Sequence, residues 1–372
     1  MKKIGITGQA GFVGAHLYNT IGLFPDQYSR VEFQRDWFNQ PELLDNFVKQ
    51  CDVIVHLAGV NRNPDPEALF AANVGMSTAL ETSLYRTGSR AHVIFSSSTQ
   101  EERDNHYGNS KKAARQKLED WAATAGGIFT GMLIPNVFGP FGKPFYNSVV
   151  STFCYQLTQG DSPRIDIDAT LNLIYVGELV REILHVINSS IHEAVYPVAA
   201  TSSSAVSEIL QILEQFRDKY HNLGIIPALN SPFEINLFNT FRSFQDAASK
   251  NPVKYIQHAD NRGAFTELIR LNVGGQVSFS TTHPGITRGN HFHTRKIERF
   301  SVVKGEALIQ LRKIGTGEVL NFQLSGEHPA YVDMPVWYTH NITNTGSDEL
   351  YTVFWINEFF DPADPDTFFE NV

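Results

Sequence analysis

The chain has 372 residues, of which 42% are hydrophobic, 19% charged and 12% aromatic, and its formal net charge at pH 7 is −9. A chain of this length exceeds what a single hydrophobic core usually serves, so we expect two domains. The acidic balance argues against a nucleic-acid-binding protein, because no basic excess is present to neutralise phosphates, although a few Arg or Lys would suffice to bind one nucleotide.

The compartment can be inferred from the cysteines and the N-terminus. Cys51 and Cys154 stand outside any paired motif, which fits a reducing compartment better than a disulfide scaffold. The start, MKKIGITGQAGFVG, has the lysines of a signal peptide but not its unbroken apolar segment, and it reads better as a strand leading into a glycine turn. No apolar run approaches the roughly 20 residues that span a bilayer. We therefore expect a cytoplasmic protein that binds neither nucleic acid nor membrane.

The first part of the chain alternates strand-like and helix-like segments. Strands are predicted at residues 3–7, 31–34, 51–58, 92–96 and 129–137, and helices at 11–24, 41–50, 73–85 and 111–125. Segment 51–58 is almost continuously apolar, the pattern of a strand buried on both faces. The alternation indicates a parallel, doubly wound sheet of the Rossmann-type α/β class. Further helices are expected at 148–159, 176–188 and 204–220.

The pattern changes after residue 243. Residues 243–252 (SFQDAASKNP) are polar and turn-rich, so we take 244–251 as a linker between domains of residues 1–243 and 252–372. In the second domain, β-like runs such as GQVSFSTT, RFSVVKG and LYTVFWINEF recur between Gly, Pro and Asn clusters. This rhythm predicts an all-β sandwich or barrel.

Small residues cluster where the first strand meets the first helix, in the GxxGxxG sequence GQAGFVG. They let the backbone approach a pyrophosphate, and the helix N-terminus offers oriented N–H donors. A plain tight turn is the alternative, but the position at the first strand–helix junction favours a dinucleotide. The cofactor contacts expected here are Thr7, Gly8, Gly11, Phe12, Val13 and Gly14.

A tyrosine and a lysine follow the fourth predicted strand. Tyr107 and Lys111 stand at i and i+4 and so share one helix face. A nearby ammonium lowers the pKa of a tyrosine, so the phenol can pass a proton to or from a hydroxyl or ketone. The serine run 96–98 could supply a hydroxyl to the same substrate oxygen. A solvated surface pair is the alternative.

Together these residues resemble the extended short-chain dehydrogenase/reductase family over roughly residues 1–240. The match includes TGxxGxxG, the strand end HLAG at 56–59, Asn73, the serine run, YxxxK and the sequence NVFG at 136–139. The resemblance implies Ser98, Tyr107 and Lys111 as catalytic residues, with Ser97 or Thr99 as alternatives to Ser98. It also implies cofactor contacts at Leu57, Ala58, Gly59 and Lys111, and a substrate contact at Asn136.

Two departures from the family narrow the reaction. Eight residues separate Ser98 from Tyr107, a shorter loop than sugar epimerases and dehydratases of this family usually have, and Thr99-Gln100 stands where dehydratases carry Asp-Glu. Ketone reduction is therefore favoured over elimination.

The second strand ends in Arg35 rather than an acidic ribose binder, and since an Arg can bind a 2′-phosphate we expect NADP (NADPH) as the cofactor. A surface Arg is the alternative.

Histidines and a glutamate cluster in the C-terminal domain. His291 and His293, two apart in a strand, point to one face, and Glu298 returns from the adjacent stretch. The spacing from Gly285 to Gly305 matches the first cupin motif residue for residue, and PVWYTH at 335–340 resembles the second, with Trp instead of its usual glycine. The resemblance implies a jelly-roll barrel with four metal ligands, His291, His293, Glu298 and His340. Such a set suits Zn, Fe, Mn or Ni, of which we expect Zn. A metal-free cupin with acid/base or structural histidines is the alternative.

The opening of this domain carries a further motif. DNRGAFTE at 260–267 resembles the DxRGxFxE opening of RmlC-type sugar-nucleotide 3,5-epimerases, which are also cupins. In that family the arginine helps to hold the nucleotide diphosphate, which implies a substrate contact at Arg262. A structural Arg–Asp pair is the alternative.

The whole chain resembles the CapF-type (WbjC-type) bifunctional enzymes of bacterial surface-polysaccharide synthesis, including the stretches HLAGVNR, YNS at 146–148, GITRGNHFH and NEFFDPADPDTFF. The resemblance implies a UDP-2-acetamido-2,6-dideoxy-4-ketohexose of the UDP-N-acetyl-L-fucosamine pathway as substrate, with contacts at Asn147 and Tyr338. The cupin would epimerise C3, and the reductase domain would use NADPH to form UDP-2-acetamido-2,6-dideoxy-L-talose. A reductase whose cupin serves only dimerisation or stability is the alternative.

Cupin barrels often cover edge strands with a second chain, so we expect a homodimer.

Overall fold

The computed structural model describes residues 1–261 and 263–372, which form two compact units. The first comprises Met1–Thr152 and Ile165–Ser207, and the second comprises Phe153–Arg164 and Glu208–Val372. Within the described ranges, no helix is both long enough and apolar enough to cross a bilayer.

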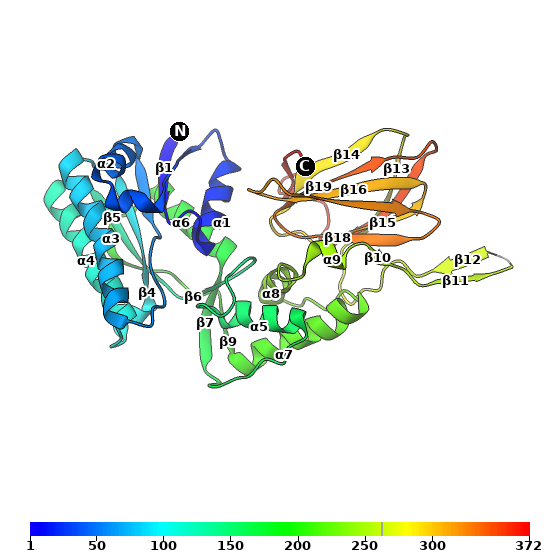
Figure 1. Cartoon of the computed structure of the whole chain (residues 1–372), viewed down its shortest axis with the longest axis horizontal. Helices are drawn as coiled ribbons and strands as arrows, with labels where there is room; N and C mark the ends of the chain where they lie inside the picture. Colours follow the sequence, from blue (N-terminus) through cyan, green and yellow to red (C-terminus); the bar gives the residue numbers. More distant parts are fainter. Residues whose placement is uncertain (262) are drawn as a thin grey trace. The chain divides into compact units, whose positions relative to one another are not determined.

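A six-stranded parallel sheet in the order β2-β1-β3-β4-β5-β8 forms the centre of the first unit. Its strands are β1 (Lys2–Thr7), β2 (Tyr28–Val31), β3 (Val53–His56), β4 (His92–Ser98), β5 (Ile128–Ile134) and β8 (Glu193–Pro197). Helices α1 (Phe12–Gly22) and α6 (Val176–Ser189) pack on one face, and α2 (Pro41–Gln50), α3 (Pro66–Thr87) and α4 (His106–Ala125) pack on the other (Figure 1). The predicted doubly wound α/β fold is confirmed.

Strand β3 shows why its sequence is continuously apolar. Val53 and Val55 belong to the core that includes α1 and α6, whereas Ile54 belongs to the core that includes α2, α3 and α4. All three are almost completely buried. A central strand of a doubly wound sheet has no solvent-facing side, so apolar residues occupy every position.

Smaller elements complete the first unit. The 3-10 helices η1 (Arg35–Asn39) and η2 (Thr99–Glu102) follow β2 and β4. A second sheet contains β6 (Asn136–Phe138), β7 (Thr170–Tyr175) and β9 (Ser202–Ala205). Along the chain, α5 (Val149–Gln159) lies between β6 and β7, and from Phe153 onward it belongs to the second unit.

Two predicted strands of this unit are wrong in their bounds. The second strand is not at 31–34, because β2 ends at Val31 and η1 begins at Arg35. The predicted strand 129–137 is two elements, β5 and β6, in different sheets. Pro135 stands between them, and its missing N–H makes it a poor continuation of a strand.

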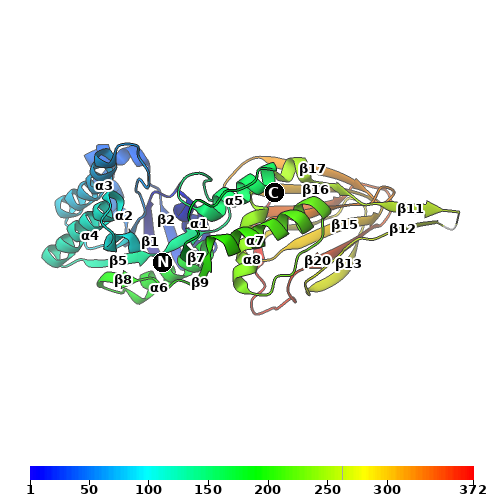
Figure 2. The same cartoon turned by 90° about the horizontal axis from the view of Figure 1, so that it is seen from below.

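The second unit contains a barrel of two five-stranded antiparallel sheets, which confirms the predicted cupin fold. One sheet orders β10 (Val253–Lys254), β18 (Ala330–Met334), β15 (Glu298–Lys304), β20 (Leu350–Ile356) and β13 (Gln276–Thr282). The other orders β17 (Val319–Ser325), β16 (Glu306–Lys313), β19 (Tyr338–Asn344), β14 (Thr287–Phe292) and β21 (Phe368–Phe369). Apolar residues from both sheets, including Val302, Ile309 and Val332, form its core. A hairpin of β11 (Gln257–Asp260) and β12 (Gly263–Thr266) projects beyond the barrel strands (Figure 2).

Helical segments precede the barrel along the chain. They are α7 (Val206–Phe216), the π-helical η3 (Arg217–His221), α8 (Pro232–Arg242) and α9 (Ala247–Lys250). Helix α8 packs within the second unit, where Asn239 donates to Arg295 O at 3.0 Å and Arg242 donates to Met334 O at 2.9 Å. Helix α8 and the segment 244–251 therefore lie inside the second compact unit. The domain boundaries predicted from the sequence, 1–243 and 252–372, stay a prediction.

Candidate functional sites

The glycine turn after β1 permits a close backbone approach. Gly8 has φ +79°, and a Cβ on it would lie 2.8 Å from the backbone N of Ala58. A Cβ on Gly14 would lie 2.1 Å from the carbonyl oxygen of Gly8. Only glycine fits either position. Helix α1 begins at Phe12 with Gly11 as its N-cap, and glycine has no side chain to occupy the first N–H groups of the helix. These features suit an anion such as a pyrophosphate.

Thr7 ties the ends of β1 and β3 together beside this turn. Its hydroxyl lies 2.6 Å from His56 Nδ1 and accepts the N–H of Ala58 at 3.4 Å. Burial lowers the pKa of His56 to about 3, so the imidazole is neutral. Leu57 continues this contact by donating its N–H to Thr7 O at 3.1 Å. The predicted cofactor contacts at residues 57–59 thus lie immediately after β3, beside the glycine turn.

Arg35 is exposed at the first residue of η1. It follows β2, which pairs in parallel with β1, the strand that leads into the glycine turn. The carboxyl ends of parallel neighbours lie at the same sheet edge, so the position is compatible with a cofactor contact.

Tyr107 lies in the first turn of α4, because Asn105 caps the helix by accepting the N–H of Gly108 at 2.8 Å. Lys111, one turn further on, is buried and its ammonium lies 4.6 Å from the centre of the Phe95 ring. Burial lowers the pKa of Lys111 to about 8, although the charge of Glu101 opposes the effect. The predicted helix face is therefore confirmed.

The expected lowering of the Tyr107 pKa is wrong for this structure. Burial, with a smaller contribution from Tyr146, raises the pKa of Tyr107 to about 12. Desolvation disfavours the phenolate, and both influences on Tyr107 act in the same upward direction. Tyr107 is consequently protonated at neutral pH, as a proton donor must be. Tyr146, whose hydroxyl accepts the N–H of Asn61 at 3.2 Å, was not among the predicted site residues.

Ser98 ends β4, and its hydroxyl accepts the N–H of Gln100 at 3.2 Å as the N-cap of η2. This bond uses a lone pair, so the hydroxyl hydrogen can still be donated to a substrate. The neighbouring serines use theirs, since Ser97 donates to Glu101 and Ser96 donates to His56 O at 3.2 Å. The arrangement favours Ser98 over Ser97.

Asn73 fixes the loop after β3 against α4. Its side chain accepts the N–H of Val60 at 2.7 Å and donates to Ser110 Oγ at 3.0 Å. Of the predicted substrate contacts in this unit, Asn136 is exposed on β6 and donates to Asn172 O at 3.1 Å, while Asn147 is exposed in the segment that follows.

The four predicted metal ligands of the second unit converge. His291, His293, Glu298 and His340 each offer a ligand atom, and these atoms all lie within 4.8 Å of one another. His291 is paired opposite His340 across strands β14 and β19. Gly289, two residues earlier, has φ +98°, and a Cβ there would lie 2.8 Å from the His340 carbonyl oxygen. Glycine is therefore required for this pairing.

The cluster fits a cation. Nε2 of His293 and of His340 lie 3.1 and 3.3 Å from Glu298 Oε2. All three atoms are buried, and within the described part of the chain none of them makes a hydrogen bond. Burial of this kind normally requires a partner, and a divalent metal bound to imidazoles and a carboxylate would provide it.

Charge and burial set the protonation of the cluster. Burial, together with the neighbouring His340 and His293, lowers the pKa of His291 to about 4. Burial also acts to lower the pKa of His293, but the Glu298 carboxylate outweighs it and raises that pKa. For Glu298 burial acts upwards, but His293 and His340 lower its pKa strongly. A carboxylate and a neutral His291 are the forms that bind metal.

The C-terminal segment around Asp366 orients His293. The Asp366 carbonyl lies 2.5 Å from His293 Nδ1, and since a carbonyl only accepts, that nitrogen carries the proton and Nε2 is left free to bind a cation. The Asp366 carboxylate accepts the N–H groups of Arg295 and Lys296, each at 3.0 Å, and the hydroxyl of Thr294 at 2.6 Å. No motif or spacing in the sequence pointed to Asp366.

The two remaining predicted residues are placed as follows. Tyr338 begins β19, is half-buried and packs partly against the barrel core, and burial raises its pKa. Arg262 lies outside the described residues. Trp337, in place of the usual glycine, takes the left-handed conformation with φ +62° and donates its N–H to His293 O at 2.8 Å. The turn before His340 is thus kept without glycine.

Each of the two units contains a region that matches a known protein family. Residues 4–199 match the NAD dependent epimerase/dehydratase family, and residues 258–368 match the polysaccharide biosynthesis C-terminal domain. A Pseudomonas aeruginosa protein described as UDP-2-acetamido-2,6-beta-L-arabino-hexul-4-ose reductase is 34% identical, over 98% of this chain and 98% of its own. The crystal structure of the capsular polysaccharide assembling protein CapF from Staphylococcus aureus covers 100% of both chains, with 34% identity and a TM-score of 0.63. The chain belongs to the CapF-type family.

Two further known proteins are similar to part of the chain. The spore coat polysaccharide biosynthesis protein SpsL of Bacillus subtilis is 25% identical over 30% of this chain and 82% of its own length. The structure of RMD from Pseudomonas aeruginosa complexed with NADPH covers 66% of this chain and 99% of its own, at 19% identity and a TM-score of 0.57, which shows the fold alone.

Proposed function

We propose that this chain is a bifunctional UDP-sugar enzyme of capsule or O-antigen synthesis, in the UDP-N-acetyl-L-fucosamine pathway. The barrel epimerises C3 of a UDP-2-acetamido-2,6-dideoxy-4-ketohexose, and the first unit reduces its C4 ketone with NADPH to UDP-2-acetamido-2,6-dideoxy-L-talose. The observation that carries the proposal is the presence of two complete constellations in one chain: Tyr107 and Lys111 on one face of α4, and the four converging ligands in the barrel.

The reduction needs a hydride and a proton. Bound NADPH would supply a hydride to C4 and leave as NADP⁺. Tyr107, protonated because its pKa is raised to about 12, donates its hydroxyl proton to the ketone oxygen, so that the ketone becomes an alcohol. The tyrosinate then regains a proton from solvent. The ammonium of Lys111 stabilises that tyrosinate, and the Ser98 hydroxyl orients the substrate oxygen.

The epimerisation needs removal and return of the C3 proton, which the C4 ketone makes acidic. A metal bound by His291, His293, Glu298 and His340, with zinc as the expected ion, would polarise the ketone or stabilise the enolate. Tyr338 lies two residues before His340 on β19 and therefore faces the same side of the strand, which supports a role in substrate binding.

Oligomeric state and compartment complete the proposal. Strand β13 is an edge strand and exposes Val277 and Phe279 at 58% and 71%. Apolar edge strands are normally covered, so we propose that a second copy covers β13 in a homodimer. The two free cysteines fit a cytoplasmic location. Sedimentation of the purified protein tests the dimer, and a monomer at micromolar concentration would contradict it.

The bifunctional proposal is tested with full-length variants and the 4-keto sugar. Tyr107→Phe should stop NADPH oxidation but leave deuterium exchange at C3 in D₂O intact. Glu298→Gln should stop the exchange. If Glu298→Gln is folded by circular dichroism and still exchanges C3, the barrel is not the epimerase. The alternative, a UDP-4-ketosugar reductase whose barrel serves dimerisation or stability, then holds.

A further inference from the structure

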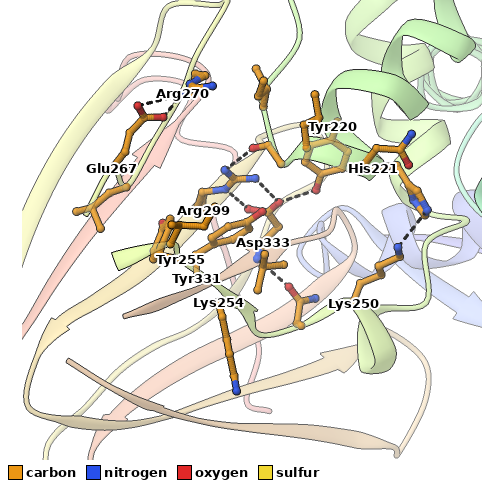
Figure 3. Close-up of a pocket in the computed structure, with 18 of the residues that line it drawn as sticks. Tyr220, His221, Lys250, Lys254, Tyr255, Glu267, Arg270, Arg299, Tyr331 and Asp333 are labelled. Carbon is orange, nitrogen blue, oxygen red and sulfur yellow. Dashed lines mark hydrogen bonds and ion pairs between the residues drawn. The ribbon is translucent and has the colours of Figure 1, made fainter. Parts of the chain in front are cut away.

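A pocket of about 440 Å³ lies within the second unit, on the outside of the barrel (Figure 3). Its floor is the outer surface of β15 and β18. Phe300 packs against the barrel core, and successive strand residues point to opposite faces, so the neighbouring Arg299 points outward. The same alternation separates Asp333 from the buried Val332 and Met334. The pocket is therefore distinct from the metal cluster inside the barrel.

The floor of the pocket is a satisfied ion pair. Arg299 donates to both carboxylate oxygens of Asp333, at 2.7 and 2.9 Å, and to the carbonyl of Gly224 at 2.8 Å. The Tyr220 hydroxyl donates to the same carboxylate at 2.6 Å. The single negative charge of Asp333 is thus offset by the single positive charge of Arg299, and the pair is neutral as a whole.

A second guanidinium is buried beside this pair. Arg242 is 4% exposed, donates to Met334 O at 2.9 Å, and lies 3.3 Å from the Tyr220 hydroxyl. Its Nη1 is buried and makes no hydrogen bond with any described residue. Asp333 is already paired with Arg299, and Arg242 makes no ion pair with any carboxylate in the described part of the chain, so one buried positive charge has no counter-charge of its own there. An unmet donor of this kind is costly and favours binding of an anion.

The rim of the pocket adds to the positive charge. Lys250, which is exposed, lies 3.1 Å from Nε2 of His221 (Figure 3). Counting Lys and Arg against Asp and Glu, the lining has five positive groups and two carboxylates. They are Arg242, Lys250, Lys254, Arg270 and Arg299 against Glu267 and Asp333. This excess of three positive charges stands in a chain whose net charge is −9. The pocket is an electropositive exception on an acidic protein.

We propose that this pocket binds a small molecule that carries a phosphate or diphosphate group. Guanidinium and ammonium groups are the side chains that bind such groups, by charge-assisted hydrogen bonds. Tyr220, Tyr255, Tyr331 and Phe265 add aromatic walls, and the volume lies in the range of small-molecule sites. The shared chemistry fits a nucleoside diphosphate or free pyrophosphate. The inference does not rest on the proposed catalytic function, because none of its residues belongs to either constellation.

Hydrogen exchange of the full-length protein tests the proposal with pyrophosphate, UDP and uridine as probes. Pyrophosphate and UDP should slow exchange in residues 242–258, and uridine should not. UDP protecting at much lower concentration than pyrophosphate identifies a nucleotide site, and equal potency identifies a diphosphate site.

Variants assign the binding to this pocket. Lys250→Gln should raise the pyrophosphate Kd read from residues 242–258 by about tenfold, in line with loss of one charge-assisted contact. The matched control Lys304→Gln, an exposed lysine outside the pocket, should leave it unchanged. Arg242→Gln should weaken binding further, and if that variant does not fold, Lys250→Gln alone decides. No protection of 242–258 by either phosphate compound, or an unchanged Kd in Lys250→Gln, overturns the proposal.

Discussion

Replacing Lys111 by methionine should make the first unit more stable while abolishing reduction. The pKa of Lys111 falls from 10.5 to about 8 on folding, chiefly because of burial. A pKa unit corresponds to about 1.4 kcal/mol, so keeping the ammonium charged in the fold costs about 3 kcal/mol at pH 7. Methionine has a similar length and no charge. Lys111→Met should therefore raise the free energy of opening of the parallel sheet by up to about 3 kcal/mol.

The gain should depend on pH in a defined direction. Because the folded-state pKa of Lys111 lies below the unfolded one, the unfolded chain binds more protons between pH 8 and 10.5, and the wild type gains stability as the pH rises through this window. The advantage of Lys111→Met should therefore shrink from pH 8 upward.

Hydrogen exchange of the β4 and β5 amides between pH 7 and 9.5 measures this free energy for the first unit alone. Lys112→Met, at the exposed neighbouring position, is the matched control and should change little. An opening free energy for Lys111→Met that is equal to or lower than that of the wild type would refute the reasoning, because it would mean that the contact with Phe95 outweighs the burial of charge.

Two further substitutions test the cofactor and metal assignments. Asp366→Ala removes the carboxylate that holds residues 294–296, while the backbone carbonyl of residue 366 that contacts His293 remains but loses its anchor. Metal binding should weaken about tenfold in chelator competition, the lower end of the effect of losing a ligand-orienting partner. The control Asp364→Ala, on an exposed surface ion pair, should leave the affinity unchanged, and equal affinity in both variants would show that the Asp366 carboxylate does not position His293. Arg35→Ser should raise the KM for NADPH about tenfold or more and leave the KM for NADH unchanged, because only NADPH has the 2′-phosphate that accepts a charged hydrogen bond from Arg35. Equal changes in the KM for both cofactors would mean that Arg35 does not contact the 2′-phosphate.

Local sequence patterns predicted most of the fold because they act over short distances. Alternating strands and helices gave the parallel sheet, and the continuous apolar run of β3 followed from its position between two cores. The predicted bounds of β2 were wrong. The predicted single strand 129–137 was also wrong, because Pro135 divides it and the two parts join different sheets. The packing of α8 in the second unit also could not be read locally, since it depends on contacts with residues more than 50 positions away.

The candidate sites divide in the same way. Tyr107 with Lys111, and His291 with His293, are close along the chain, so the helix and strand periods already bring them together. His340 meets them through the pairing of β14 with β19, which the cupin motif implied but no local pattern could show. Asp366 and the raised pKa of Tyr107 arise from tertiary burial and contacts, for which spacing carries no signal.

The central claim is that one chain performs two reactions on one ketosugar, and an isotope experiment tests it most directly. The purified protein is incubated in D₂O with the UDP-4-keto sugar and NADPH, and the product is examined by NMR. We predict deuterium from solvent at C3 with inverted configuration, and hydrogen from NADPH at C4. A reduced product that retains its original C3 hydrogen and configuration would contradict the account.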